Sequence, residues 1–395
     1  MTVPAADVPF QFRNKTILLI SPQPWDHIAV SKHHYAAELG RRGNRVYFLE
    51  PPRERRAGGI ELRPAVDAAN VTIVRYHPGV PFALRFHARP VFDAVMRWRI
   101  GAIRRAIGGS IDVVWCFDFN LFSDLRAFGA PVALYHPVDP IQEPHQIRPA
   151  RTADVVLGVS EEILRPFRMF DAPVVCLGHG LAHDFVAAYD DRPRGEVEIA
   201  RVGRPRVGYF GNLLRAPLNR PLWRQLVTGN PDVTFEFWGP YIPSDGAGWP
   251  SPETSEFVAF LQAAPNVRLH GAVPTAELAR AVQDIDVFVI SYALHPTESD
   301  RSNSHKILEY LSTGKVVVAS RFSAYDRHPD LLEMPVDGDD RHLPEILETV
   351  LSDLPRYNAP ERQERRRAFA LEHTYDAHVA RIEHAVQSAR AARLG

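Results

Sequence analysis

Two series of short, strongly apolar runs, separated by one long polar stretch, constrain the fold of this chain more than any other feature. Runs this apolar fit strands that are covered on both faces, as in a parallel sheet. The segment 31–44 between the first two runs has a helical pattern, with Gly43 and Asn44 as its stop. This order is typical of βαβ units. The first series lies at 16–20, 45–50, 71–76, 112–117, 131–136, 154–160 and 173–178.

The second series resumes after the polar, charged stretch 187–206. Two consecutive α/β sheets of about equal size predict two Rossmann-like domains that face a cleft, with ligands outside the carboxyl ends of the strands. A length of 395 residues also favours two domains. The runs of the second series lie at 206–212, 233–240, 266–273, 286–292 and 315–320. We expect an N-terminal domain over 1–190, a linker over 191–205, a C-terminal domain over 206–360 and a helical tail over 361–395.

Several classes of protein do not fit this sequence. No apolar run approaches the roughly 18 to 20 residues of a membrane span, and the first twenty residues lack the pattern of a signal peptide. The stretch after the first strand, "SPQPWDHIAVSKHH", has no glycine, which excludes a dinucleotide-binding fingerprint there. Cys116 and Cys176 lie in apolar runs without metal-type spacing. We therefore expect a protein of the reducing cytoplasm.

The net charge of −1 conceals a basic region. Between Arg41 and Arg105 there are 14 arginines and 5 acidic residues. Within it, the segment 90–107 has apolar residues at helical spacing, Trp98 among them, interleaved with arginines. This pattern favours a helix that lies on an anionic membrane surface, and a solvated helix packed on its own domain is the alternative. No nucleic-acid-binding motif accompanies the region, so we expect no nucleic-acid partner.

Lysine is rare in this arginine-rich chain. One of the few lysines is Lys306, in the stretch "NSHKILEYLSTGKVVVAS" over 303–320. The pattern predicts a short helix that begins near Lys306 and leads into a buried strand. A compact ammonium at a helix N-terminus adds to the backbone N–H donors there and suits a phosphate group. Lys315, which follows Gly314 in a turn, is expected to be an exposed residue before the strand.

The same stretch resembles the donor-binding helix of the GT-B glycosyltransferases. Three further segments resemble that family in order and spacing: "VVCLGHGLAHDF", "VGYFGNLL" and "NVRLHGAVPTAELARAVQDIDVFVISY". The pattern is most similar to the xanthan glucuronosyltransferase type and to the teichuronic-acid and exopolysaccharide transferases. The resemblance implies transfer of a sugar from a UDP, GDP or dTDP donor to a lipid-linked or polysaccharide acceptor. It further implies bacterial surface polysaccharide synthesis at the inner membrane face, without a cofactor.

The resemblance also implies which residues bind the donor. Asn303, Ser304 and His305 are expected to cap the helix and contact phosphate, and Glu309 to accept ribose hydroxyls. Tyr292 either contacts the donor or packs in the core. Lys306 at a helix N-terminus can replace the charge of a divalent metal, so we expect no metal. The implied donor residues are Gly211, Asn212, Tyr292, Arg301, Asn303, Ser304, His305, Lys306 and Glu309.

A catalytic base is expected in the first domain. His136 and Asp139 lie in the loop after the apolar run 131–136, and loops at strand ends commonly carry catalytic groups. The resemblance favours Asp139 as the general base, and a turn-capping aspartate is the alternative. Retaining relatives often carry E-x7-E, but Arg301 stands eight residues before Glu309, which favours inversion. The expected acceptor-binding residues are Asp26, His27, Ser31, His34 and His179.

Two other functions fit the same fold. A nucleotide-sugar 2-epimerase would act on one soluble sugar nucleotide and would not need the basic region. A sugar-nucleotide-binding protein without catalysis would keep the roles of Lys306 and Glu309 but would transfer nothing.

Overall fold

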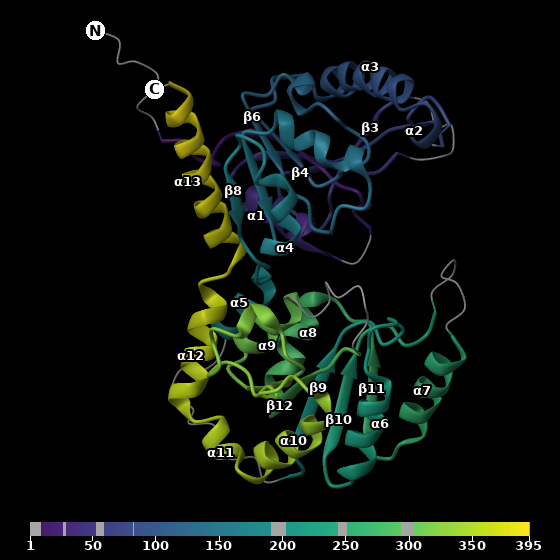
Figure 1. The fold of residues 1–395 in the computed structure, drawn as a ribbon, viewed down its shortest axis with the longest axis vertical. Helices are drawn as coiled ribbons and strands as arrows, with labels where there is room; N and C mark the ends of the chain where they lie inside the picture. The colour runs from purple at the N-terminus through teal and green to yellow at the C-terminus, as the bar shows by residue number, and fades with distance from the viewer. Residues whose placement is uncertain are drawn as a thin grey trace. The chain divides into compact units, whose positions relative to one another are not determined.

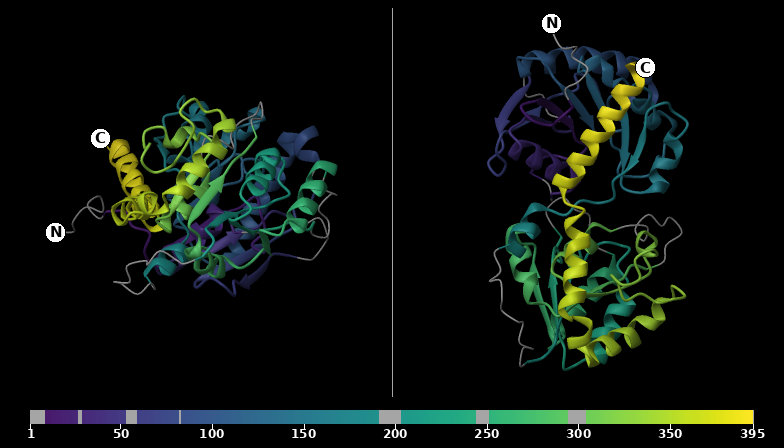
Figure 2. Two further views of the ribbon diagram at one scale, coloured as in Figure 1. Left: turned by 90° about the horizontal axis from the view of Figure 1, so that it is seen from below. Right: turned by 90° about the vertical axis from the view of Figure 1, so that its left-hand side faces the viewer.

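The computed structural model describes residues 9–26, 29–52, 59–81, 83–190, 203–243, 251–293 and 304–394. The chain divides into two compact units (Figures 1 and 2). The first unit comprises Met1–Gly178 together with Tyr375–Gly395, and the second comprises His179–Thr374. Each unit has its own sheet, which confirms the α/β class with two Rossmann-like domains. No helix of the described residues is both long and apolar enough to cross a bilayer.

The sheet of the first unit has eight strands in the order β3-β4-β2-β1-β5-β6-β7-β8. All its pairs are parallel except β3 with β4. Seven of these strands coincide with the predicted apolar runs. The eighth, β3, has the polar sequence "ELRP" and lies at the sheet edge, so it carries no apolar pattern. The strands are β1 Thr16–Ile20, β2 Arg45–Leu49, β3 Glu61–Pro64, β4 Val71–Arg75, β5 Val113–Cys116, β6 Val132–Tyr135, β7 Val155–Gly158 and β8 Val174–Cys176.

Successive residues of β1 point to opposite faces of this sheet, and each face is covered. Ile17 and Leu19 belong to the core that α1 and α13 complete. Leu18 and Ile20 belong to the core that α3 completes, which confirms the predicted helix over 90–107. The helices of this unit are α1 Ser31–Arg41, α2 Leu84–His87, α3 Arg89–Ile107, α4 Glu161–Leu164 and α13 Tyr375–Leu394, with the short 3-10 helices η1 Leu125–Phe128, η2 Pro144–Thr152 and η3 Arg165–Phe167.

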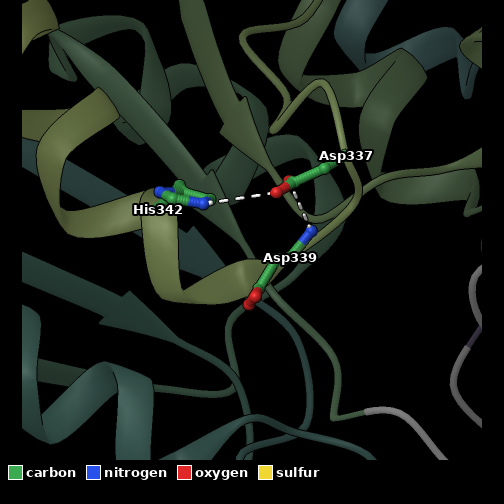
Figure 3. Close-up of side chains that lie close together, drawn as sticks. All are labelled: Asp337, Asp339 and His342. Atoms are coloured by element: carbon green, nitrogen blue, oxygen red, sulfur yellow. Dashed lines mark hydrogen bonds and ion pairs between the residues drawn. The ribbon is translucent and has the colours of Figure 1, made fainter.

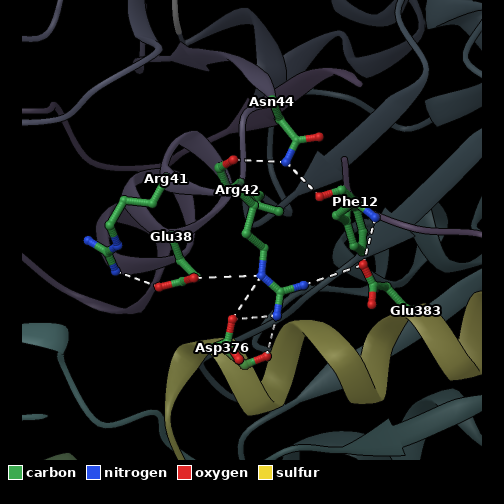
Figure 4. Close-up of polar contacts among 8 residues, drawn as sticks. Phe12, Glu38, Arg41, Arg42, Asn44, Asp376 and Glu383 are labelled. Carbon is green, nitrogen blue, oxygen red and sulfur yellow. Dashed lines mark hydrogen bonds and ion pairs between the residues drawn. The ribbon is translucent and has the colours of Figure 1, made fainter. Parts of the chain in front are cut away.

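The last helix, α13, belongs to the first unit (Figure 4). The guanidinium of Arg42 lies 2.5 Å from the carboxylate of Asp376 and 3.4 Å from that of Glu383. Glu383 in turn accepts a hydrogen bond of 2.6 Å from the backbone N–H of Phe12. The expectation of one separate tail over 361–395 is therefore wrong, because its first part stays with the second unit and its last helix packs on the first.

The sheet of the second unit has five strands, all parallel, in the order β11-β10-β9-β12-β13. All five were predicted, but the expected equality of the two sheets is wrong. The strands are β9 Arg206–Phe210, β10 Thr234–Trp238, β11 Val267–Gly271, β12 Val287–Ile290 and β13 Val316–Ala319. The helices are α5 His183–Asp190, α6 Arg220–Gly229, α7 Pro252–Ala263, α8 Thr275–Ala281, α9 His305–Ser312, α10 Leu343–Ser352, α11 Leu354–Tyr357 and α12 Pro360–Leu371, with η4 Val282–Asp284, η5 Ser323–Tyr325 and η6 Asp340–His342.

The boundary between the units lies earlier than expected. The first unit ends at Gly178 and not near residue 190, because α5 packs on the second unit. Phe185 of α5 is fully buried, and its ring stacks on that of Phe210 at a centroid distance of 5.9 Å. Most of the expected linker 191–205 lies outside the described residues.

Each sheet contains one point where the strand order reverses. In the first unit it lies between β1 and β5, and in the second between β9 and β12. Loops that leave neighbouring parallel strands in opposite directions open a crevice at the carboxyl edge, where α/β sheets bind ligands. Functional side chains are therefore expected at these two edges.

Candidate functional site

At the reversal point of the second sheet, Lys306 and Tyr292 form a buried pair. Tyr292 follows β12 by two residues, and Lys306 lies in the first turn of α9. The Lys306 ammonium donates a hydrogen bond of 2.9 Å to the Tyr292 hydroxyl and lies 5.6 Å from the centroid of its ring. The two residues are 6% and 3% exposed. The structure thus fixes a positive charge at the start of a helix, where helix dipoles favour anions.

Gly211, which directly follows β9, lies against this lysine. Its φ of +150° falls in the region that favours glycine. A Cβ atom at this position would lie 2.5 Å from Cε of Lys306 and 2.8 Å from the Tyr209 hydroxyl. Asn212 stabilises the same turn, because its Oδ1 accepts a hydrogen bond of 2.9 Å from the N–H of Leu214. The structure therefore brings Gly211, Lys306 and Tyr292 together, as the sequence indicated.

Glu309 lies one helical turn after Lys306. Burial raises the pKa of its carboxyl from 4.5 to about 7, and the positive charge of Lys306 opposes that rise. This carboxyl therefore changes charge near neutral pH. Ser304, which precedes α9, is buried, but its hydroxyl makes no capping hydrogen bond within the described residues.

His179 also lies at this helix. Its ring meets that of His305 edge-on at a centroid distance of 5.8 Å, and both residues belong to the second unit. The structure thus places His179 beside an expected donor residue of the second unit, whereas the other expected acceptor residues belong to the first unit. Two further expected donor residues, Arg301 and Asn303, lie outside the described residues.

A serine–aspartate network at the same edge was not foreseen. Oδ2 of Asp340 accepts hydrogen bonds from the Ser291 hydroxyl at 3.2 Å, the Ser320 hydroxyl at 3.0 Å and the Asn219 amide at 3.3 Å. Ser291 and Ser320 directly follow β12 and β13. Asp340 therefore joins two strand ends to the loop before α6. A serine near the end of each of two apolar runs was the signal that the sequence offered.

Next to this network lie Asp337, Asp339 and His342 (Figure 3). One donor atom from each lies within 4.8 Å of the others, and carboxylates with imidazole can hold a divalent cation. The chain itself already supplies partners: the Arg341 guanidinium lies 2.5 Å from the Asp339 carboxylate, and Nε2 of His342 lies 3.3 Å from the Asp337 carboxylate. The Arg341 guanidinium lowers the pKa of Asp339 to about 2. Asp337 and Asp339 have D-x-D spacing, so an expected absence of any D-x-D motif, which was one ground for expecting a metal-free site, is wrong.

At the first sheet, the two expected catalytic residues have different surroundings. His136 is fully buried, and its ring stacks on Phe117 at 4.6 Å and on Trp115 at 6.1 Å between centroids. Asp139, in the loop after β6, is exposed. His136 therefore lies in the aromatic core beneath the edge, and only Asp139 reaches the surface.

The residues expected to bind the acceptor do not form one cluster. Asp26 pairs with Arg75 at 3.0 Å and with Arg63 at 3.1 Å. The His34 ring stacks on Tyr375 at a centroid distance of 5.1 Å, and burial lowers its pKa to about 4, with smaller contributions from His33 and Arg41. Ser31 begins α1 and is half-buried, and His27 lies outside the described residues.

Two charged residues at this edge were missed. Lys32, in the first turn of α1, is 2% exposed, and Asp118, two residues after β5, is 4% exposed. Burial lowers the pKa of Lys32 to about 8, while the charges of Asp139 and Asp118 oppose that change. Lys315 is also buried, at 3% exposed, so the expectation of an exposed residue is wrong. Lysine is rare in this sequence, and that rarity was the signal that marked Lys32, Lys306 and Lys315 as unusual.

The two α/β sheets with their reversal points match the GT-B fold, and solved structures share it. Sucrose-phosphate synthase from Thermosynechococcus elongatus matches with a TM-score of 0.64 at 13% identity, over 96% of this chain and 100% of that chain. Trehalose 6-phosphate synthase from Burkholderia multivorans matches with a TM-score of 0.64 at 14% identity, over 96% and 100%. Anabaena HepE matches with a TM-score of 0.62 at 14% identity, over 95% and 100%.

A family model adds a finding from the sequence itself. Residues 215–384 match the model described as glycosyl transferase-like, which covers most of the second unit. No curated protein sequence matches the chain.

Proposed function

We propose that the protein is a nucleotide-sugar-dependent glycosyltransferase. The observation that carries this proposal is the Lys306–Tyr292 pair against Gly211 at the reversal point of the second sheet. A fixed ammonium at a helix N-terminus suits a diphosphate, which must leave with its charge stabilised. The glycosyl transferase-like match over 215–384 supports the same reading. Anabaena HepE was solved with UDP and glucose, and the trehalose-6-phosphate enzyme of E. coli with UDP-2-fluoro glucose.

In this proposal each unit supplies one part of the chemistry. Lys306 binds the diphosphate of the donor, and Glu309 accepts hydrogen bonds from its ribose. Asp139 takes the proton of the acceptor hydroxyl as that oxygen bonds to the anomeric carbon. The bond from the anomeric carbon to the phosphate oxygen breaks, and the nucleoside diphosphate leaves. One displacement of this kind inverts the anomeric configuration.

We further propose that the acceptor is lipid-linked or polysaccharide, as in bacterial surface polysaccharide synthesis, and that α3 docks on an anionic membrane. One face of α3 is buried through Phe92, Met96, Ile100, Ile103 and Ile107. The other exposes Trp98 at 62% and Val91 at 53%, beside the exposed arginines Arg97, Arg104 and Arg105. An amphipathic helix with tryptophan and arginine on its free face suits the membrane interface.

Vesicle co-sedimentation tests the docking. Each basic residue near an anionic surface contributes about 1 kcal/mol, so binding should fall as salt rises. Trp98→Ala should weaken binding, whereas Met169→Ala, which removes another exposed apolar side chain of the same unit (76% exposed), should not. Equal binding to neutral and anionic vesicles would contradict this part of the proposal.

A panel of UDP-, GDP- and dTDP-sugars tests the function as a whole. We expect calorimetry to show binding of one donor class, and transfer to occur only when an acceptor is present. Conversion of the donor sugar to its epimer without acceptor would instead indicate a 2-epimerase. Binding with no turnover in extracts that contain lipid-linked acceptors would indicate a binding protein without catalysis.

A further inference from the structure

The Lys32 side chain has surroundings that packing alone does not explain. It is 2% exposed, and within the described residues its ammonium has no hydrogen-bond partner and no ion pair. Burial of a charged side chain without a protein partner costs stability, because buried charges are ordinarily paired. In a chain that uses arginine almost everywhere else, a lysine here is an unusual choice.

Two acidic residues contribute to the electrostatic surroundings of this ammonium. Lys32 interacts electrostatically with Asp139 and with Asp118. These aspartates follow β6 and β5, and β5 lies between β6 and β1 with all three strands parallel, so their carboxyl ends share one edge. Oδ1 of Asp118 accepts hydrogen bonds from the N–H groups of Asn120 at 2.6 Å and Leu121 at 2.9 Å, which fixes its carboxylate.

We infer that Lys32, Asp118 and Asp139 form a subsite for the hydroxyl groups of a sugar acceptor, a step that rests on the proposed transferase function. An ammonium offers three donors, and a carboxylate only accepts. A sugar hydroxyl can do both, so neighbouring hydroxyls accept from Lys32 and donate to the aspartates. A bound anion would satisfy Lys32 but would meet the negative charge of Asp139 and that of Asp118, although burial raises the pKa of Asp118 and the charge of Arg85 also acts on it. The set therefore favours a neutral polyol over a phosphate.

Lys32→Met separates binding from packing, because methionine keeps the length of the side chain and removes its charge. Burial lowers the pKa of Lys32 below that of a free lysine, so the unfolded chain holds the proton more tightly than the folded protein does. The charge therefore destabilises the fold at neutral pH, and we expect Lys32→Met to raise the melting temperature. A lysine with a purely structural role would give the opposite shift.

The decisive readout is the ratio of two rates in the same enzyme. Transfer to methyl glycosides of glucose, galactose and mannose needs the subsite, whereas slow hydrolysis of the donor by water does not. We expect Lys32→Met to lower transfer by roughly 10- to 100-fold, the scale of a charge-assisted hydrogen bond, with hydrolysis changed less than about twofold. Lys315→Met, at another buried lysine (3% exposed) in the second unit, is the matched control for removing a buried charge.

Three results would overturn the inference: equal loss of transfer and hydrolysis, unchanged transfer, or a lower melting temperature of Lys32→Met. If that variant does not fold, Asp118→Asn decides, since it should lower transfer selectively in the same way. The proposed function fails separately, if the wild-type protein neither binds nor hydrolyses any nucleotide sugar. Titration of the methyl glycosides into wild type and Lys32→Met then still tests the subsite, and equal affinities would refute it.

Discussion

The carboxyl edges of the two sheets both hold a buried lysine, yet the two lysines have different neighbours. Lys306 is bound by the Tyr292 hydroxyl at 2.9 Å and lies against the glycine turn after β9. Lys32 has no such bond within the described residues and interacts with Asp118 and Asp139. The first arrangement leaves a positive charge for an anion, and the second balances it with negative charge. This difference supports the two proposals made above, a diphosphate at the edge with Lys306 and a neutral sugar at the edge with Lys32.

The largest effect is expected from Asp139→Asn, which removes the proton acceptor of the first edge and keeps the shape of the side chain. The rate of transfer should fall by on the order of 10² to 10⁴, with donor affinity nearly unchanged. Steady-state kinetics and calorimetry on the same preparation measure both. Asp171→Asn, at another exposed aspartate of the first unit, is the control. A variant that keeps most of its turnover, or that loses donor binding, would move the base elsewhere.

A smaller effect, confined to the second edge, is expected from the pH dependence of donor binding. The raised pKa of Glu309, about 7, means that its carboxyl is largely protonated below neutral pH. Because the ionised form accepts the ribose hydroxyls, affinity should fall by up to about tenfold for each pH unit below 7. Glu309→Gln should bind more weakly above pH 7 and lose this dependence, as calorimetry from pH 5.5 to 8.5 can show. An unchanged profile in the variant would remove Glu309 from the donor site.

The same group makes an independent prediction for stability. The folded pKa of Glu309 lies above its usual value of 4.5, so the folded protein holds this proton more tightly than the unfolded chain. Its contribution to stability is therefore present at low pH and is lost as pH rises through about 7. In Glu309→Gln that decline should be smaller, which melting curves across the same pH range would register even if no donor binds.

The smallest effect is expected from removal of metal ions. If Lys306 carries the charge of the diphosphate, EDTA should leave the rate of transfer unchanged. Loss of activity that Mg²⁺ or Mn²⁺ restores would contradict this expectation. Asp337→Asn would then show whether the cluster of Asp337, Asp339 and His342 holds the ion, because only a ligand variant should raise the metal concentration needed for activity.

Much of the fold follows from local patterns. All of the predicted apolar runs form strands, because a short apolar run between turn residues is the local pattern of a buried strand. The polar edge strand β3 has no such pattern. The packing of α13 on the first unit includes ion pairs of Asp376 and Glu383 with Arg42, which lies more than 300 positions earlier in the chain, so no local pattern could indicate it.

Some residues of the candidate site could likewise be predicted from local patterns, and others could not. Gly211, Tyr292 and Lys306 stand directly at strand and helix ends, where sequence patterns place residues well. His136 also follows a strand, but the depth of its ring depends on Phe117 and Trp115 from the neighbouring strand. The role of Lys32 emerges only when the ends of β5 and β6 are brought beside α1. The sequence alone therefore does not predict the charge and burial that distant segments contribute to a residue's surroundings.

The most direct test of the comparison is calorimetric titration of the preferred nucleotide sugar into wild type, Lys306→Ala and Lys32→Met. Loss of the Lys306 ammonium should weaken donor binding by about 1.5 to 3 kcal/mol, the scale of a charge-assisted hydrogen bond. Loss of the Lys32 ammonium should leave donor affinity unchanged, because its subsite takes the acceptor. Unchanged donor affinity in a folded Lys306→Ala protein, or a loss of donor affinity in Lys32→Met, would contradict the assignment of the two edges.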